Sequence, residues 1–311
     1  MENVRGVLSA AVRHRPLKDR GPGHPPLEPD ELLGSALLLI LQELEATGYY
    51  VVFDLLNAAD YGVPQTRERV IFIGSRDGEP VAIPGRTHTE TRVNGHPPWV
   101  SLREGLRGLK DPDPQYREFS PSKERYLKDI PAGGNWRDLS PARQQRALGG
   151  AYNSWGGRTG FFRRLAWSKP APALTTRPDS KATMFCHPDE LRPLTVREYA
   201  RIQQFPDDWT FAGGLPQQYL QIGNAVPLGL GEAVGYALRD AMRARRRVET
   251  GKVVCENEDL IARIERRPTT VLNPQRMRKV STTSAAREWR AKGPRHRTSL
   301  AEFLRGRAGG E

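Results

Sequence analysis

Residues Leu191 to Pro227 read LRPLTVREYARIQQFPDDWTFAGGLPQQYLQIGNAVP. Thr195 is typical of a helix N-cap, and Glu198, three places later, completes a capping box. The positions that follow give this helix an apolar side, and Pro206 cannot continue it. The stretch closes on Gly-Asn-Ala-Val-Pro, which predicts a turn of small residues, and an apolar helical pattern follows from Leu228 to Met242. We therefore expect a short capped helix, a turn and a second helix.

A second informative stretch, Leu56 to Arg69, reads LNAADYGVPQTRER, and the chain opens with MENV. In this order the three stretches resemble signature blocks of the DNA cytosine-5 methyltransferase family. The second stretch is similar to the family pattern Asn-x-x-Asp-Tyr-Gly-Val-Pro-Gln-x-Arg-x-Arg, and Glu-Asn-Val is a further block that stands at the end of a strand. The resemblance covers about residues 1 to 245, so the chain looks like the C-terminal part of such an enzyme.

The chain from Glu31 to Gly74, on both sides of the block at Leu56 to Arg69, has the pattern of an α/β protein. Glu31 to Thr47 carries leucine and isoleucine at helical spacing, and Tyr49 to Leu56 and Val70 to Gly74 are two β-branched and aromatic runs separated by turn residues. A helix followed by a pair of strands is typical of the second half of an open α/β sheet. The resemblance implies that this is part of a Rossmann-like, S-adenosylmethionine-dependent methyltransferase domain.

From Gly78 to about Thr183 the composition changes to glycine, proline and polar residues, with tryptophans scattered among basic side chains. No long helical pattern holds, so we expect a small, irregular, strand-rich domain. The resemblance implies that it is the target-recognition region. The expected organisation is a partial catalytic domain at 1–77, the recognition region at 78–183, a return to the catalytic domain at 184–245, and a basic, partly disordered tail at 246–311.

The formal charge of +12 favours a polyanionic partner, and the resemblance implies double-stranded DNA. From Arg239 onward there are 19 basic and nine acidic residues, so most of the excess charge lies in the tail. Basic runs of this kind are usually solvated, and we interpret the tail as an extension rather than a DNA-binding module.

No apolar run approaches the roughly 20 residues that cross a membrane, and no signal peptide opens the chain. The two cysteines have no metal-ligand spacing, which favours a reducing, cytoplasmic setting without a metal site.

The resemblance assigns catalytic roles to Glu2, Arg67 and Arg69. The family glutamate holds N3 and the exocyclic amine of a cytosine that has been flipped out of the duplex. The two arginines bracket that cytosine and its phosphate, and one of them orients the glutamate. At positions i and i+2 of a strand, Arg67 and Arg69 are expected to face the same way.

The resemblance also assigns residues to the cofactor and to DNA. Gly223, Asn224 and Val226 match the block that closes over the methionine part of S-adenosylmethionine. The family usually has Thr-Leu where this chain has Ala173-Leu174, so one hydroxyl near the DNA backbone is absent and the following threonines are candidates to replace it. Arg197 and Gln203 are expected to tie the capped helix to the recognition region. The candidate DNA-binding residues are Leu174, Thr175, Thr176, Arg177, Arg197 and Gln203.

Two family blocks are absent from the 311 residues: the Phe-x-Gly-x-Gly loop, and the Pro-Cys dipeptide that carries the nucleophile. Cys186 and Cys255 lack the family context, and we expect neither to be catalytic. Three hypotheses remain open. The chain is one polypeptide of a split enzyme, a truncated gene product or miscalled start, or a non-catalytic DNA-binding remnant. The DNA upstream of the Met1 codon distinguishes them, because it encodes the missing blocks in another frame, in the same frame, or not at all.

Overall fold

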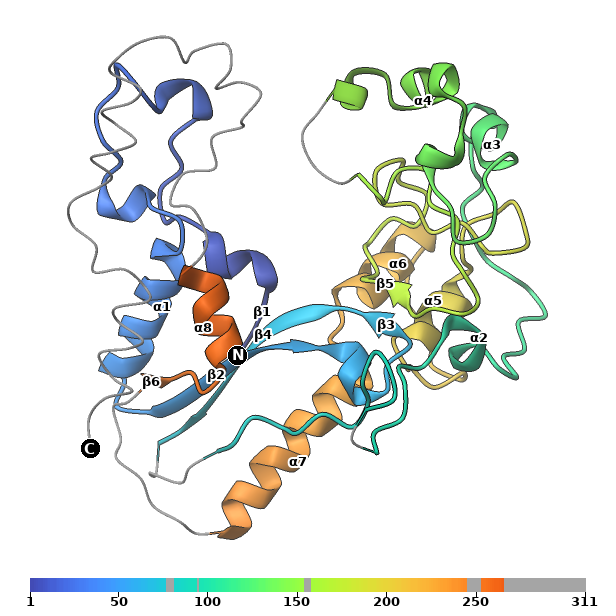
Figure 1. Cartoon of the computed structure of the whole chain (residues 1–311). Coiled ribbons are helices and arrows are strands. Elements are labelled where there is room, and N and C mark those ends of the chain that lie inside the picture. Colours follow the sequence, from blue (N-terminus) through green and yellow to red (C-terminus); the bar gives the residue numbers. More distant parts are fainter. Residues whose placement is uncertain (77–80, 94, 154–157, 245–252, 266–311) are drawn as a thin grey trace. The chain divides into compact units, whose positions relative to one another are not determined.

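The computed structural model describes residues 1–76, 81–93, 95–153, 158–244 and 253–265, which form two compact units (Figure 1). Unit 1 contains Met1–Leu56, Arg69–Pro84 and the chain from Tyr236 onward, and unit 2 contains Asn57–Glu68 and Gly85–Gly235. These limits differ from the expected domain boundaries. In particular, residues 184–235 lie in the same unit as most of the expected recognition region, and not with the sheet.

A four-stranded sheet forms the centre of unit 1 (Figure 1). Its strands lie in the order β1 (Glu2–Val4), β4 (Glu68–Ser75), β2 (Tyr50–Asn57) and β6 (Val253–Val254). β1 runs antiparallel to β4, and β6 runs parallel to β2 with Val253 opposite Val51. The two strands predicted from the apolar runs are confirmed, and the Glu-Asn-Val block lies on a strand.

Helices α1 (Ser35–Ala46) and α8 (Glu258–Glu265) pack against one side of this sheet. The helix predicted at residues 31–47 is confirmed, although its α-helical part begins at Ser35 after a single 3-10 turn. Alternate strand residues point to these helices because side chains of a strand alternate between its two faces. The shared core contains Leu37 and Leu41 of α1, Val51 and Phe53 of β2, Val70 and Phe72 of β4, and Leu260 and Ile261 of α8.

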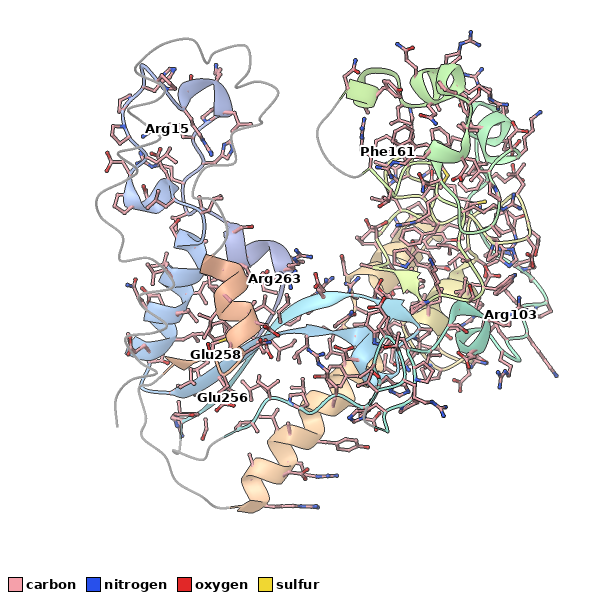
Figure 2. All side chains as sticks on the ribbon, viewed as in Figure 1. Arg15, Arg103, Phe161, Glu256, Glu258 and Arg263 are labelled. Carbon is pink, nitrogen blue, oxygen red and sulfur yellow. The ribbon has the colours of Figure 1, made fainter. Side chains whose placement is uncertain are left out.

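Part of the tail that we expected to be partly disordered is folded, because residues 253–265 pack onto the sheet (Figure 2 labels Glu256, Glu258 and Arg263 of this segment). Leu260 and Ile261 are buried, and Ile264 packs beside them. The side chain of Asn257 accepts a hydrogen bond from the Leu260 amide at 2.9 Å and donates one to Asp54 Oδ1 at 2.7 Å. A short apolar side and a capping asparagine thus fold this part of a basic stretch. Residues 246–252 and 266–311 of the expected tail lie outside the described residues.

Unit 2 is mainly helices and loops, and it contains less strand than expected. Within the described part of residues 85–183, β5 (Ala171–Pro172) is the one strand, and it pairs in parallel with β3 (Gln65–Thr66). Ser-Pro pairs begin two of the short helices of this region, since serine and proline favour the first helical positions. The α-helices that lie entirely within unit 2 are α2 (Leu102–Gly105), α3 (Pro121–Leu127), α4 (Pro141–Leu148), α5 (Val196–Ile202) and α6 (Leu215–Asn224). Short 3-10 helices complete the chain at Arg5–Ser9, Leu17–Asp19, Pro29–Glu31, Ala58–Tyr61, Trp136–Asp138 and Gly149–Asn153.

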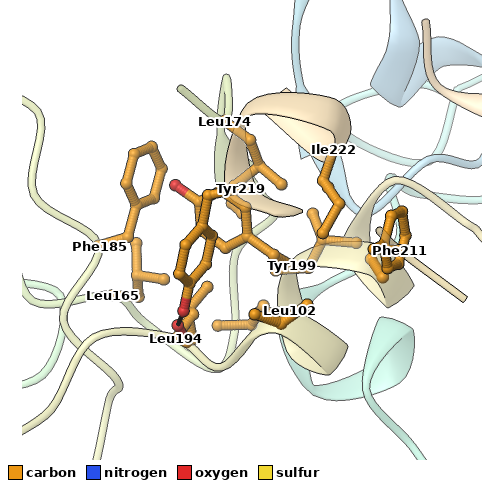
Figure 3. Packing of buried hydrophobic residues seen from close by; sticks show 13 residues of the cluster. Leu102, Leu165, Leu174, Phe185, Leu194, Tyr199, Phe211, Tyr219 and Ile222 are labelled. Atoms are coloured by element: carbon orange, nitrogen blue, oxygen red, sulfur yellow. Dashed lines mark hydrogen bonds between the residues drawn. The ribbon is translucent and has the colours of Figure 1, made fainter. Parts of the chain in front are cut away.

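Helix α5 confirms the predicted capping box and stands in the core of unit 2. Thr195 Oγ1 accepts a hydrogen bond from the Glu198 amide at 3.1 Å, and the Thr195 amide donates one to Glu198 Oε2 at 2.7 Å. Tyr199 is fully buried and makes edge-to-face contacts with Phe185 and Tyr219, at ring-centre distances of 5.5 and 5.1 Å (Figure 3). The helix is therefore fixed by local capping and by aromatic packing.

The turn predicted at Gly-Asn-Ala-Val-Pro is shorter than expected. Helix α6 extends through Asn224, so the turn begins only at Ala225, before α7 (Leu228–Ala244) confirms the second predicted helix. Among the described residues, no helix has the length and apolar character needed to cross a membrane.

Candidate functional site

In unit 1, the candidate glutamate and one candidate arginine form an ion pair. The Arg69 Nε lies 2.5 Å from Glu2 Oε1, and the Arg69 side chain is only 13% exposed. Strand pairing brings them together, because Val4 at the end of β1 lies opposite Arg69 of β4. Burial lowers the pKa of the Arg69 guanidinium, and the Glu2 carboxylate opposes this shift. The arrangement can hold a carboxyl group in one orientation.

In unit 2, Arg67 lies in a buried position between two backbone carbonyl groups. Its Nη1 donates to Leu174 O at 2.8 Å and its Nη2 donates to Gly223 O at 2.9 Å. The Arg67 amide donates to Asn57 Oδ1 at 3.0 Å, which fixes the backbone there. Only 3% of Arg67 is exposed, so its guanidinium braces the protein itself in this arrangement.

Arg67 and Arg69 belong to different units, so the expectation that they face the same way stays a prediction. Arg67 lies between β3 and β4, because β3 ends at Thr66 and β4 begins at Glu68. Arg67 is thus not part of the strand that carries Arg69. Their guanidinium groups contact different partners, one the backbone of unit 2 and the other the side chain of Glu2.

Two buried glutamines extend the network around Arg67. Gln65 Nε2 donates to Gln203 Oε1 at 2.9 Å, and Gln65 Oε1 accepts from the Leu174 amide at 2.8 Å. Gln203 Nε2 donates to Ile222 O at 2.7 Å and to Ala225 O at 3.2 Å. Gln65 and Gln203 are both fully buried, and together with Arg67 they join four stretches of sequence: residues 65–67, Leu174, Gln203 and residues 222–225. We call Gln65, Arg67 and Gln203 with their backbone partners the buried polar network.

This network changes what Leu174 and Gln203 can offer to DNA. Leu174 is 2% exposed, and both its amide and its carbonyl are engaged by the network. Gln203 is fully buried and its amide group is engaged at both ends. In this structure the two residues position neighbouring chain segments. The side-chain partners of Gln203 are Gln65, Ile222 and Ala225, which lie outside residues 78–183, so its expected role of tying the capped helix to the recognition region stays a prediction.

Two features of this site were not predicted from sequence. Gln204 has a positive φ of 66°, its Oε1 accepts from the Gly229 amide at 2.9 Å, and its Nε2 donates to Gly62 O at 3.2 Å. Asp60 accepts from Trp99 Nε1 at 2.8 Å. Both residues lie in stretches that the sequence marks as informative, since Asp60 is within Leu56 to Arg69 and Gln204 follows Gln203. Their partners, however, lie 25 to 142 residues away.

The candidate cofactor residues divide into one buried and two exposed positions. A side chain at Gly223 would come within 2.6 Å of Thr175 O, so this glycine permits close approach of the Thr175 backbone. Asn224 and Val226, by contrast, are exposed, and Val226 is 37% exposed. Two of the three residues are thus free to cover a ligand, while Gly223 fixes the turn on which they stand.

The remaining candidate DNA residues are partly accessible. Thr175 and Thr176 are half-buried, and the Arg177 side chain is 63% exposed. Arg197 Nη1 donates to Trp209 O at 2.6 Å, so this guanidinium is held against the loop that follows α5. Arg177 is therefore the candidate with the most surface to offer a polyanion.

Neither cysteine has the environment of a nucleophile. Cys186 is buried in unit 2, and burial raises the pKa of its thiol to about 11. In unit 1, burial raises the pKa of the Cys255 thiol to about 12. The reactive species of a cysteine is the thiolate, so both side chains remain protonated and unreactive near neutral pH.

Comparison with known proteins places the chain in a family. The family model "C-5 cytosine-specific DNA methylase" matches residues 27–240. The chain is 38% identical over 208 residues to the Type II methyltransferase M.Sau96I of Staphylococcus aureus, covering 66% of this chain and 46% of that protein. It is 40% identical over 193 residues to the Type II methyltransferase M.Eco47II of Escherichia coli, covering 60% and 45%. The chain thus spans about half the length of these relatives. The chain therefore belongs to the C-5 cytosine-specific DNA methylase family.

Proposed function

We propose that this chain is the C-terminal portion, or a separate subunit, of a DNA cytosine-5 methyltransferase of a restriction-modification system. The observation that carries the proposal is the family match over residues 27–240, within which the buried polar network joins the signature blocks. The substrate is a cytosine within a specific site of duplex DNA. The irregular region at residues 78–183 is proposed to choose that site through groove contacts.

Each candidate residue has a role that fits its position. Glu2 holds N3 and the exocyclic amine of the flipped cytosine, and the ion pair with Arg69 keeps its carboxyl group in place. Arg67 braces the last turn of α6 rather than touching the base, so it acts as a positioning residue. Asn224 and Val226 cover the methionine part of S-adenosylmethionine, and that cofactor supplies the methyl group when bound.

The reaction needs groups that these 311 residues do not contain. The sequence has no Pro-Cys dipeptide and no Phe-x-Gly-x-Gly loop, and both cysteine thiols have raised pKa values. We therefore propose a second polypeptide that carries both blocks. Among the described residues, β1 pairs with β4 on one side and lies at the end of the sheet order. Its other edge is suited to accept a further strand from such a partner.

Two other functions compete with this proposal. A truncated product of a longer gene would have the same fold and no activity of its own. A DNA-binding remnant would bind duplex DNA and remain inactive with any partner. The DNA sequence upstream of the Met1 codon distinguishes the truncated product from the split enzyme. Reconstitution distinguishes the DNA-binding remnant from the split enzyme.

The deciding experiment is reconstitution with purified proteins. The 311-residue chain alone is expected to transfer no methyl group, because covalent catalysis depends on the missing nucleophile. Mixed with a polypeptide that carries the Phe-x-Gly-x-Gly and Pro-Cys blocks, it should methylate cytosine. A duplex containing fluorocytosine should then trap covalently on the partner. A covalent adduct on Cys186 or Cys255, or no activity in any mixture, would contradict the proposal.

A further inference from the structure

A pocket of about 400 Å³ lies in unit 2, between helix α6 and the segment from Thr176 to Asp179. One part of its wall is apolar and comes from the first two turns of α6: Leu215, Pro216, Tyr219 and Leu220. Another part carries charge and comes from Arg117, Arg177 and Asp179. Its volume lies in the range of about 300–1,000 Å³ that is typical of small-ligand sites.

The charged part of this pocket has more cations than anions. Asp179 Oδ2 lies 3.7 Å from Arg117 Nε, 3.5 Å from Lys123 Nζ and 3.8 Å from Arg177 Nη2. One buried carboxylate thus lies within 3.8 Å of three cationic groups, two of which, Arg117 and Arg177, line the pocket. Lys123 is also fixed to the backbone, since its Nζ donates to Asp179 O at 2.6 Å. The carboxylate and Lys123 form the base of the cluster.

The two arginines of the cluster remain accessible. The Arg117 and Arg177 side chains are 54% and 63% exposed, whereas that of Lys123 is 22% exposed. Their distances to Asp179 exceed the 2.7–2.9 Å of a strong charge-assisted hydrogen bond, so a second anion can compete for both guanidinium groups. On the apolar side, Leu220 is 47% exposed although it is a large hydrophobic residue. The pocket therefore matches a ligand with an anionic group and an apolar face.

We propose that this pocket holds one nucleotide unit of the bound DNA strand. Its phosphate lies between Arg117 and Arg177, and its sugar and base lie against Leu215 and Leu220. Asp179 is a positioning residue that keeps the two guanidinium groups together. This inference rests on the proposed function, which supplies DNA as the partner. It adds Arg117, Asp179 and the α6 surface to the binding site.

Three variants of the full chain test the pocket through its affinity for duplex DNA at several salt concentrations. Arg117→Gln removes one phosphate contact, so affinity should fall about tenfold and the slope of log affinity against log salt should decrease in magnitude by about 1. Leu220→Trp fills the pocket without changing the charge, and it should also reduce affinity and slope. Arg146→Gln, an exposed position on α4 outside the pocket, is the charge control and should change neither by as much.

The outcomes are distinct. Equal effects of Arg117→Gln and Arg146→Gln, with no effect of Leu220→Trp, would mean that only general charge matters and would overturn the proposal. A second arm titrates the full chain with a short phosphorylated trinucleotide and with inorganic phosphate, monitored by the amide chemical shifts of Thr176 and Leu220. Shifts with the trinucleotide but not with phosphate support a nucleotide site, even if duplex binding fails and the proposed function falls. Shifts with phosphate alone, or with neither, refute the nucleotide assignment.

Discussion

The guanidinium of Arg67 donates a hydrogen bond to the carbonyl oxygen of Gly223, 156 residues later in the chain, at 2.9 Å. The same side chain binds Leu174 O, so one buried cation holds the strand-end block, the segment after β5 and the end of α6 together. Because both terminal nitrogens of Arg67 are hydrogen-bonded, this side chain fixes the end of α6. It thereby sets the positions of Asn224 and Val226, which follow Gly223 in the chain. Arg67 therefore positions the residues of the candidate site through hydrogen bonds to the protein backbone.

Replacement of Arg67 by methionine should destabilise unit 2. The change leaves two buried carbonyl groups without their donors, and hydrogen bonds to a charged group contribute about 1.5–3 kcal/mol each. We expect a loss of about 3 kcal/mol or more in the free energy of unfolding, measured by urea denaturation. Arg146→Met, on the surface of α4, is the matched control and should cost less than about 0.5 kcal/mol. Equal stability of Arg67→Met and the parent chain would show that the two hydrogen bonds are unimportant.

The folded segment at residues 253–265 changes how the basic tail must be tested. A chain ending after residue 265 keeps β6 and α8 and should unfold at the same urea concentration as the full chain. A chain ending after residue 251 loses both elements, exposes Leu37 and Leu41 of α1, and should be strongly destabilised. Circular dichroism during urea unfolding measures the difference.

The first of these truncations also tests the role of the tail in DNA binding. If the basic residues after 265 contact DNA, their removal should weaken binding at low salt and reduce the salt dependence without changing the preferred site. Identical salt slopes for the full and shortened chains would show that these residues do not contact DNA.

His187 should make the stability of unit 2 depend on pH. Burial lowers the pKa of this imidazole, while the Glu198 carboxylate opposes the shift. Its Nδ1 accepts hydrogen bonds from the amides of Asp189 and Glu190 at 3.3 and 3.1 Å, which requires the neutral ring. The unfolded chain binds a proton near pH 6.5 and the folded chain only at lower pH. Stability is therefore complete above about 6.5 and declines as the pH falls toward the folded pKa.

The measurement compares urea unfolding at pH 7.5 and 5.5. His187→Asn should reduce the loss of stability between these two values, because the titrating group is removed. His24→Asn, at an exposed position, should leave the pH dependence unchanged. A pH dependence that is the same in all three chains would assign it to other groups.

Exchange of the recognition region tests the proposed origin of sequence specificity. In a reconstituted enzyme, residues 78–183 replaced by those of another family member should move the methylated site. The exchange must keep Leu102, Leu165 and Leu174 apolar, since these side chains pack against α5 and α6 in the core of unit 2. Bisulfite sequencing of a methylated plasmid identifies the site. A variant that is active at the original site would locate specificity elsewhere.

The features that could be predicted from sequence are local ones. Thr195 and Glu198 are three residues apart, so their capping box is visible in the sequence, and the periodic apolar residues of α1 and β2 predict both elements. The buried polar network could not be predicted in this way. Gln65 and Gln203 are separated by 138 residues, and Asn257 and Asp54 by 203. Gln65 in β3 and Gln203 just after α5 have no local feature that distinguishes a buried, fully hydrogen-bonded amide from a solvated one.

The folded part of the tail could not be located from sequence for a related reason. Three apolar side chains in α8 are too few to stand out against the surrounding basic residues, and they become a core only because β2 and α1 provide a surface for them. Likewise, the short helices of the 78–183 region begin at Ser-Pro pairs, which are weak signals beside many prolines and glycines. Composition describes such a region as irregular, but tertiary packing decides which of its pieces become helical.

The pairing of Val51 with Val253 has a consequence for synthesis of the protein. All of unit 2 lies between residues 57 and 235, so it can fold on the ribosome while the last strand of unit 1 is still untranslated. During that interval the outer edge of β2 has no neighbour and the apolar side of α1 lacks α8. Nascent chains therefore carry an open sheet edge until β6 emerges, and it is in this interval that chaperones or premature self-association would act.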